Sequence, residues 1–226
     1  MRSDSPLKHK ILFIGDSITD CGRREQHAPL GNGYVALVAD MLRLHSPASA
    51  FSVINRGIGG NTIEDLRSRW TDHVLCEAPD WLVIKIGIND CNRYVSDSSQ
   101  ALQSPQQYAK IYDQILSHTR EALPNTKILI LSPFYLSKDT NLPDAYRARV
   151  CAKLKQYIEH AQQAAETHQA FYYDLNAKFE KLLEHMTPSE LADDAVHPNR
   201  TGTLFIAQQV FAALCEAHCI EQSRTA

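Results

Sequence analysis

The chain has 226 residues, of which 44% are hydrophobic, and a formal net charge of −3 at pH 7. This length and composition suit one α/β domain, predicted to span residues 1–226 with flexible tails at about 1–8 and 222–226. The charge excludes a basic surface for nucleic acid or anionic lipid. No apolar run approaches the roughly 20 residues of a membrane span, so membrane partners are not expected.

The N-terminal residues and the cysteines indicate in which cellular compartment the protein is expected. The first ten residues are polar and run directly into the first apolar segment, so we do not expect a secretory signal peptide. The six cysteines form no Cys-x-x-Cys motif and lack a metal-site rhythm, although Cys215 and Cys219 lie one helical turn apart. We therefore expect reduced thiols, a cytoplasmic protein and no metal or cofactor.

Apolar runs and helical periods alternate along the chain. Taken in order, the predicted elements are a strand at 11–14, a loop at 20–33, a helix at 34–44, a strand at 51–54, a helix from 62 to about 79, a strand at 81–86, a loop to 103, a helix at 104–123, a strand at 127–131, a helix at 145–167, a strand at 171–173, a helix at 177–186 and a last helix ending at about 218.

This alternation predicts an α/β fold with a doubly wound, parallel, five-stranded sheet and right-handed crossovers. The expected strand order is 2-1-3-4-5, which places the ligand crevice between the first and third strands. These two strands end in Ser17 and Asn89. The two side chains should therefore meet at one edge of the sheet.

Ser17 is a candidate nucleophile, because Gly15 and Asp16 break the first strand just before it. The best candidate for its base is His197. Asp194 lies three residues earlier, close enough in a helical turn to accept the Nδ1 proton and orient the imidazole. Each of these short motifs, taken alone, is more often a turn or an accidental pair.

An attacked ester carbonyl becomes an oxyanion, which needs aimed donors. The candidates are the backbone N–H groups of Ser17 and Gly60 and the side-chain amide of Asn89. The alternative for the glycines around Gly60 is a flexible strand–helix turn, and for Asn89 it is an Asx turn. No phosphate-binding glycine motif is present.

The motifs as a set resemble the SGNH (GDSL-type) hydrolase family. Its four blocks match, in the family's order and over nearly the whole chain, the motifs Gly15-Asp16-Ser17, Gly57-x-x-Gly60, Gly87-x-Asn89-Asp90 and Asp194-x-x-His197. The resemblance implies a three-layer, flavodoxin-like sheet. It also implies a triad of Ser17, Asp194 and His197, and an oxyanion hole of Ser17, Gly60 and Asn89.

Within that family, residues 15–23, 33–35, 87–90 and 133–135 are similar to intracellular bacterial acetylxylan esterases. These enzymes remove acetyl groups from imported xylo-oligosaccharides. The similarity implies a serine esterase for short acyl groups, with an acetylated sugar as substrate and a possible homo-oligomer. Asp193 stands where these enzymes carry a tryptophan before the triad acid, so a wall of the substrate site differs.

Other residues near the predicted sheet edge are candidates for binding the substrate: Asp16, Arg56, Arg93, Tyr94, Phe134 and Tyr135. The aromatic side chains would stack on a sugar; the alternative for Phe134 and Tyr135 is packing against a flanking helix. Two rival functions stay open. One is a thioesterase or lysophospholipase on the same scaffold, and the other is a non-catalytic ligand-binding module.

Overall fold

The computed structural model describes residues 8–47 and 50–217. The predicted flexible tails therefore lie outside the described residues, apart from Lys8, where the first strand begins. The strands are β1 (Lys8–Gly15), β2 (Ala50–Gly57), β3 (Trp81–Lys85), β4 (Lys127–Leu131) and β5 (Phe171–Tyr173). Their order in the sheet is β2-β1-β3-β4-β5 and every neighbouring pair is parallel, as predicted.

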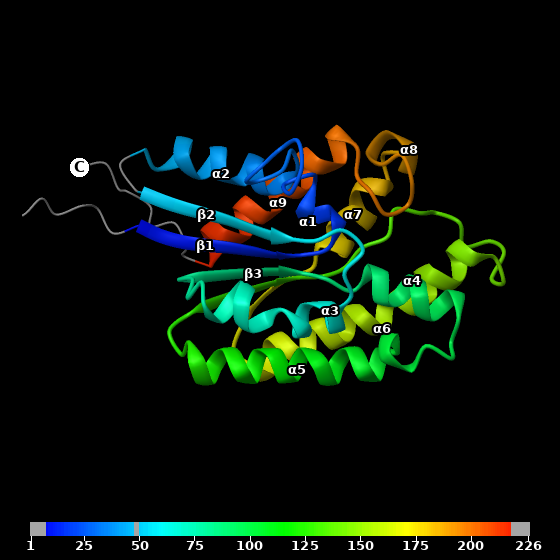
Figure 1. Ribbon diagram of the computed structural model, residues 1–226. Coiled ribbons are helices and arrows are strands. Elements are labelled where there is room, and N and C mark those ends of the chain that lie inside the picture. The colour runs from blue at the N-terminus through cyan, green and yellow to red at the C-terminus, as the bar shows by residue number, and fades with distance from the viewer. Residues whose placement is uncertain (1–7, 48–49, 218–226) are drawn as a thin grey trace, which may run out of the picture.

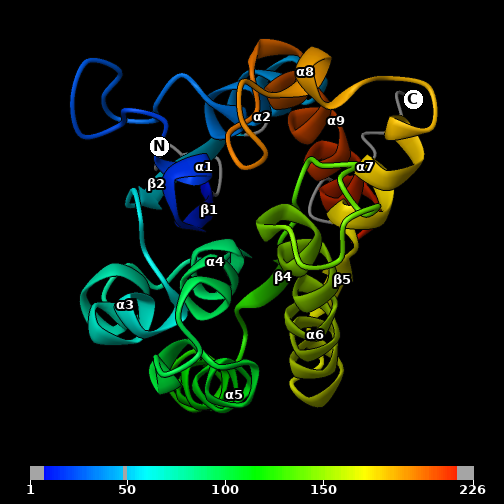
Figure 2. The same ribbon diagram turned by 90° about the vertical axis from the view of Figure 1, so that its right-hand side faces the viewer.

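Helices cover both faces of this sheet. They are α1 (Ser17–Asp20), α2 (Tyr34–His45), α3 (Ile63–Ser68), α4 (Ile88–Ser96), α5 (Pro105–Ala122), α6 (Tyr146–Thr167), α7 (Leu175–Leu183), α8 (Pro188–Leu191) and α9 (Arg200–Glu216), with a π-helical turn η1 (Thr71–Leu75) and a 3₁₀ turn η2 (Ala101–Gln103). Helices α2, α7 and α9 cover one face, and α3, α5 and α6 the other (Figures 1 and 2). This confirms the three-layer arrangement. None of the described helices is long and apolar enough to cross a membrane.

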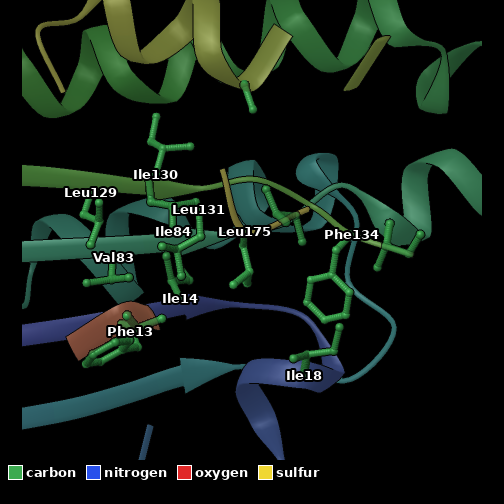
Figure 3. Packing of buried hydrophobic residues seen from close by; sticks show 14 of the residues in the cluster. Phe13, Ile14, Ile18, Val83, Ile84, Leu129, Ile130, Leu131, Phe134 and Leu175 are labelled. Carbon is green, nitrogen blue, oxygen red and sulfur yellow. The ribbon is translucent and has the colours of Figure 1, made fainter. Parts of the chain in front are cut away.

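The core explains why the strands read as continuous apolar runs. The middle strands of the sheet are buried on both faces, as expected for parallel strands between two helical layers. Figure 3 shows side chains from three of them packed together, among them Phe13, Ile84 and Leu129, each with at most 1% of its surface exposed. The parallel pairing brings the carboxyl ends of these strands to one edge, where α1 and α4 begin (Figure 1).

The predicted loop from 91 to 103 is wrong, because α4 continues to Ser96. Its buried residues Ile88, Cys91 and Val95 have helical spacing, but the polar residues around them hide the period. The helix expected from 62 to about 79 is interrupted. It ends at Ser68 and is followed by the π-helical turn η1.

Candidate active site

A buried ion pair stabilises the turn between β1 and α1 that carries Ser17. Ser17 is the first residue of α1, and the Asp16 carboxylate caps this helix by accepting the N–H of Ile18 at 3.0 Å. The Lys85 ammonium lies 3.2 Å from Asp16, and both side chains are at least 99% buried. The prediction that Asp16 binds substrate is therefore wrong, because its carboxylate is enclosed and satisfied within the protein.

Ser17, His197 and Asp194 form one hydrogen-bonded chain. The Ser17 Oγ lies 3.0 Å from the His197 Nε2, and the His197 Nδ1 lies 2.8 Å from the Asp194 Oδ2. The second carboxylate oxygen accepts the backbone N–H groups of Val196 and His197 at 2.6 and 2.7 Å. The Nδ1–H therefore donates to Asp194, and the Nε2 lone pair faces the serine hydroxyl.

These contacts also set the charge of Asp194. Partial burial raises the pKa of its carboxyl, but the hydrogen bonds from His197 and Val196 outweigh this and hold the pKa below its ordinary value. Asp194 is therefore an anion at neutral pH. It can stabilise the imidazolium that forms when His197 accepts a proton.

The loop that carries this pair is anchored from two sides. The Leu136 N–H, after β4, donates to the Ala195 carbonyl at 2.7 Å. Ala192 and Pro198 form a short antiparallel bridge across the base of the loop. The loop is thereby held against both the sheet edge and the start of α9, which aims His197 at Ser17.

The loop after β2 approaches the nucleophile helix closely. A Cβ on Gly57 would overlap the backbone of Asp20, so only glycine fits there. The Gly59 N–H donates to the Asp20 carboxylate at 2.9 Å. Gly60 has a φ of +77°, a Cβ added to it would meet open space, and in the described part of the chain its N–H donates to no protein acceptor. Its amide is thus available to a substrate.

Asn89, in the first turn of α4, closes the other side of this loop. One N–H of its side chain donates to the Asn61 carbonyl at 2.9 Å, which leaves the second N–H available to a ligand. The structure thus brings the loop around Gly60 and the side chain of Asn89 together. Their roles as oxyanion donors stay a prediction.

Replacing Asn89 with alanine should lower kcat for a nitrophenyl acetate by about two to three orders of magnitude. The variant removes the side chain predicted to donate to the oxyanion and also the hydrogen bond to the Asn61 carbonyl. KM should change little, because the ester carbonyl gains its full charge only during the reaction. Asn92→Ala on the same helix is the control and should keep the wild-type rate; unchanged turnover in Asn89→Ala would refute the assignment.

Asp90 is a fully buried carboxyl next to Asn89. Its two oxygens accept the Ile63 N–H, at 3.1 and 3.3 Å, which ties α4 to the start of α3. Burial raises the pKa of Asp90 to about 7, and the hydrogen bond from Ile63 opposes this only partly. The folded protein therefore holds a proton there that the unfolded chain releases near pH 4.

The contribution of Asp90 to the free energy of unfolding should consequently fall as the pH rises from about 4 to 7, because the folded state binds the extra proton across this window. From pH 5 to pH 8 the loss due to Asp90 should be on the order of 2–3 kcal/mol. Asp90→Asn should flatten this slope in urea unfolding at the two pH values, whereas the exposed control Asp40→Asn should not. An equally steep slope in Asp90→Asn would exclude Asp90 as its source.

Phe134 does not line the substrate site as predicted. Its side chain is fully buried, its ring centroid lies 4.6 Å from that of Phe179 on α7, and the Lys85 ammonium lies 4.8 Å from its centre. Figure 3 shows it among the core side chains. The alternative, packing against a flanking helix, is therefore correct. Tyr135 is also buried, with 9% of its surface exposed.

The remaining predicted substrate residues are partly engaged with the protein. Arg56 is half-buried and forms an ion pair with Glu77. Arg93 is exposed, but one of its amino groups donates to the Gly60 carbonyl at 2.9 Å. The Lys153 ammonium lies over the ring of Tyr94, at 5.7 Å from its centre. Contact of these three predicted residues with substrate stays a prediction.

Lys85, the ion-pair partner of Asp16, is not among the site residues predicted from the sequence. The sequence does contain a signal for its ion pair, because a single lysine inside an otherwise apolar buried strand must find a partner.

Across residues 8–47 and 50–217, no three or more His, Cys, Asp or Glu side chains are grouped to hold a metal ion.

A serine, an imidazole and a carboxylate in hydrogen-bonded sequence at the carboxyl edge of a parallel sheet define the site of a serine hydrolase. A model of the GDSL-like Lipase/Acylhydrolase family matches residues 13–203. The chain belongs to this family, and it is a carboxylic ester hydrolase.

Individual relatives agree with this assignment. An acetylxylan esterase of Geobacillus stearothermophilus is 37% identical over 206 residues, which cover 88% of this chain and 90% of that protein. The crystal structure of the acetylxylan esterase Axe2 from that organism superimposes with a TM-score of 0.82 at 32% identity, covering 98% and 99% of the two chains. An α/β hydrolase from the metagenome of Lake Arreo, Spain, gives a TM-score of 0.80 at 31% identity, covering 92% of this chain and 96% of that chain.

Solved variants of Axe2 identify the residue types at its own site. Its catalytic mutants replace a serine, an aspartate and a histidine with alanine, and the aspartate and histidine are three positions apart. Asp194 and His197 have the same spacing here. A further Axe2 variant alters the tryptophan directly before that aspartate, where this chain has Asp193.

Proposed function

We propose that the protein removes short acyl groups, chiefly acetyl, from esterified xylo-oligosaccharides or related sugars. The observation that carries the chemistry is the hydrogen-bonded chain from Ser17 through His197 to Asp194. The support for the substrate class is the 37% identity to an acetylxylan esterase over most of both chains. Asp193 stands where Axe2 has a tryptophan, so we expect a wall of the substrate site to differ there.

In the first half of the proposed reaction, the Ser17 Oγ attacks the ester carbonyl while the His197 Nε2 accepts its proton. The carbonyl oxygen gains a negative charge, which the N–H groups of Ser17, Gly60 and Asn89 stabilise. The bond to the sugar oxygen then breaks. His197 gives its proton to that oxygen, and the acetyl group remains on Ser17.

In the second half, a water molecule gives a proton to His197 and attacks the acyl-enzyme carbonyl. The same three donors hold the second oxyanion. The bond to Ser17 breaks, its Oγ recovers the proton from His197, and acetic acid leaves and gives its remaining proton to the solvent. Asp194 keeps the imidazole in one tautomer through both halves.

The test is a panel of acetylated xylo-oligosaccharides and other acetylated sugars, scored by acetate release for wild type and Ser17→Ala. A parallel series of nitrophenyl esters from acetyl to long-chain acyl measures the chain-length preference. Fast release from the xylo-oligosaccharides, with activity falling as the acyl chain lengthens, would support the proposal. A preference for long-chain esters or thioesters would favour the lysophospholipase or thioesterase alternative.

We also propose a cytoplasmic location and assembly into a homo-oligomer. The free thiols of Cys21, Cys76, Cys91, Cys151 and Cys215 support a reducing compartment. Cell fractionation tests the location. Light scattering of the purified protein tests the assembly.

A further inference from the structure

Arg69 is a half-buried residue, directly after α3, whose guanidinium connects several segments near the active site. Its Nε donates to the Asn61 Oδ1 at 2.9 Å, and its Nη1 donates to the Arg56 carbonyl at 2.8 Å. Its Nη2 donates to the Gly15 carbonyl at 3.2 Å. The Nη1 also lies 2.8 Å from the His73 Nδ1. One side chain thus links the ends of β1 and β2 to the loop that follows β2.

The two ends of this bridge lie beside the two backbone donors of the expected oxyanion hole. Gly15 comes two residues before Ser17, and its carbonyl also accepts the Ile58 N–H at 3.0 Å. Asn61 directly follows Gly60, and its own carbonyl accepts the side chain of Asn89. Arg69 therefore joins the residue that follows Gly60 to the end of the strand that precedes Ser17.

The local helix geometry directs Arg69 at this loop. The chain leaves α3 at Arg69, whose backbone is no longer helical, and the π-helical turn η1 begins two residues later. Between them, Trp70 is buried, and its Nε1 donates to the Thr119 Oγ1 on α5 at 2.9 Å. This hydrogen bond holds the segment between α3 and η1 against α5, and so restricts the position of the neighbouring Arg69 guanidinium.

The charge states of Arg69 and His73 are compatible with these hydrogen bonds. Burial and the nearby charge of Arg23 lower the pKa of Arg69 to about 10, so the guanidinium stays charged at neutral pH. Burial and the charge of Arg69 lower the pKa of His73, so its imidazole is neutral and can accept an Arg69 N–H.

We propose that Arg69 is a positioning residue for ester hydrolysis: its planar guanidinium holds the Gly60 loop in register with Ser17, so that both backbone amides meet the oxyanion. This inference rests on the oxyanion hole in the proposed function. A guanidinium offers five donors in a rigid plane, whereas a lysine ammonium is a compact charge on a flexible stem. Lysine at this position should therefore keep the charge but lose most of the bridge.

The experiment compares Arg69→Met and Arg69→Lys with Arg67→Met. Arg67 is the matched control, because it lies two residues earlier, is exposed and, among the residues that the structure describes, pairs only with Glu64 on the same helix. Steady-state rates on a nitrophenyl acetate give kcat and KM, normalised to the Ser17 sites that a fluorophosphonate labels at completion. This normalisation removes any loss caused by misfolded protein.

Per labelled site, Arg69→Met should lower kcat roughly 100-fold, with KM within about threefold of wild type, because small displacements of catalytic groups cost this much. The affinity for a phenylboronic acid, which forms a tetrahedral adduct on the serine, should fall by a similar factor. Arg69→Lys should recover only part of the rate, and Arg67→Met should match the wild type.

A per-site kcat of Arg69→Met within threefold of wild type would overturn the inference, even if its melting temperature falls. A wild-type per-site kcat in Arg69→Lys would also overturn the inference, because the positive charge of residue 69 would then suffice without the planar guanidinium. A different pattern signals failure of the proposed function: wild type that releases no acid from any ester, or Ser17→Ala that is as active as wild type.

Discussion

Replacing Ser17 with alanine should abolish turnover, with a fall in kcat of about six orders of magnitude. The Ser17 Oγ is the atom that His197 faces at 3.0 Å, and no other hydroxyl is bonded to that imidazole within the residues described. The variant should also lose covalent labelling by a fluorophosphonate. Stopped assays of acetate release, with enzyme at high concentration, measure the residual rate.

The fold should survive this change. Ser17 is half-buried at the start of α1, and the Asp16 cap and the Lys85 ion pair that hold the turn do not use its side chain. An unchanged melting temperature therefore belongs to the expected result. Ser68→Ala, at an exposed serine on α3, is the control. Retention of even one hundredth of wild-type activity in Ser17→Ala would show that the nucleophile has been misassigned.

The Asp194→Asn variant should lower kcat by about four orders of magnitude. An asparagine can still accept the two backbone N–H groups through its carbonyl oxygen, so the loop should keep its shape. Its amide would then face the His197 Nδ1 as a donor. The imidazole would shift to the tautomer whose Nε2 carries the proton, and that nitrogen cannot accept the proton of Ser17.

Another aspartate–histidine pair provides a control for this prediction. The Asp113 Oδ1 lies 2.8 Å from the His168 Nε2, the same separation as in the catalytic pair, but this pair lies apart from Ser17 in the fold. Asp113→Asn should keep the wild-type rate. A loss of less than tenfold in Asp194→Asn would mean that His197 is oriented by the loop alone.

The sheet and the central motifs were accessible from the sequence because their signals are local. Each buried strand is a short apolar run followed at once by polar or glycine residues, and the alternation with helices dictates parallel pairing. Ser17 and Asn89 could be placed together because the strand order puts β1 beside β3. The spacing of Asp194 and His197 lies within a single turn of chain.

What the sequence could not supply depends on contacts between distant segments. Asp16 reads as an accessible polar residue until Lys85, 69 positions later, is seen to lie against it. Phe134 could equally stack on a sugar or pack on a helix, and only the position of Phe179 decides. The bridge that Arg69 forms cannot be predicted from the sequence, because its hydrogen bonds end on groups 8, 13 and 54 positions earlier in the chain and depend on how β1, β2 and α3 pack together.

The nucleophile and its base are separated by 180 positions. During synthesis the ribosome therefore makes the serine 180 residues before the histidine. Over that stretch the nascent chain carries the hydroxyl without the imidazole that would activate it. We therefore expect ester cleavage to begin only after the segment with His197 has emerged and packed against the sheet edge.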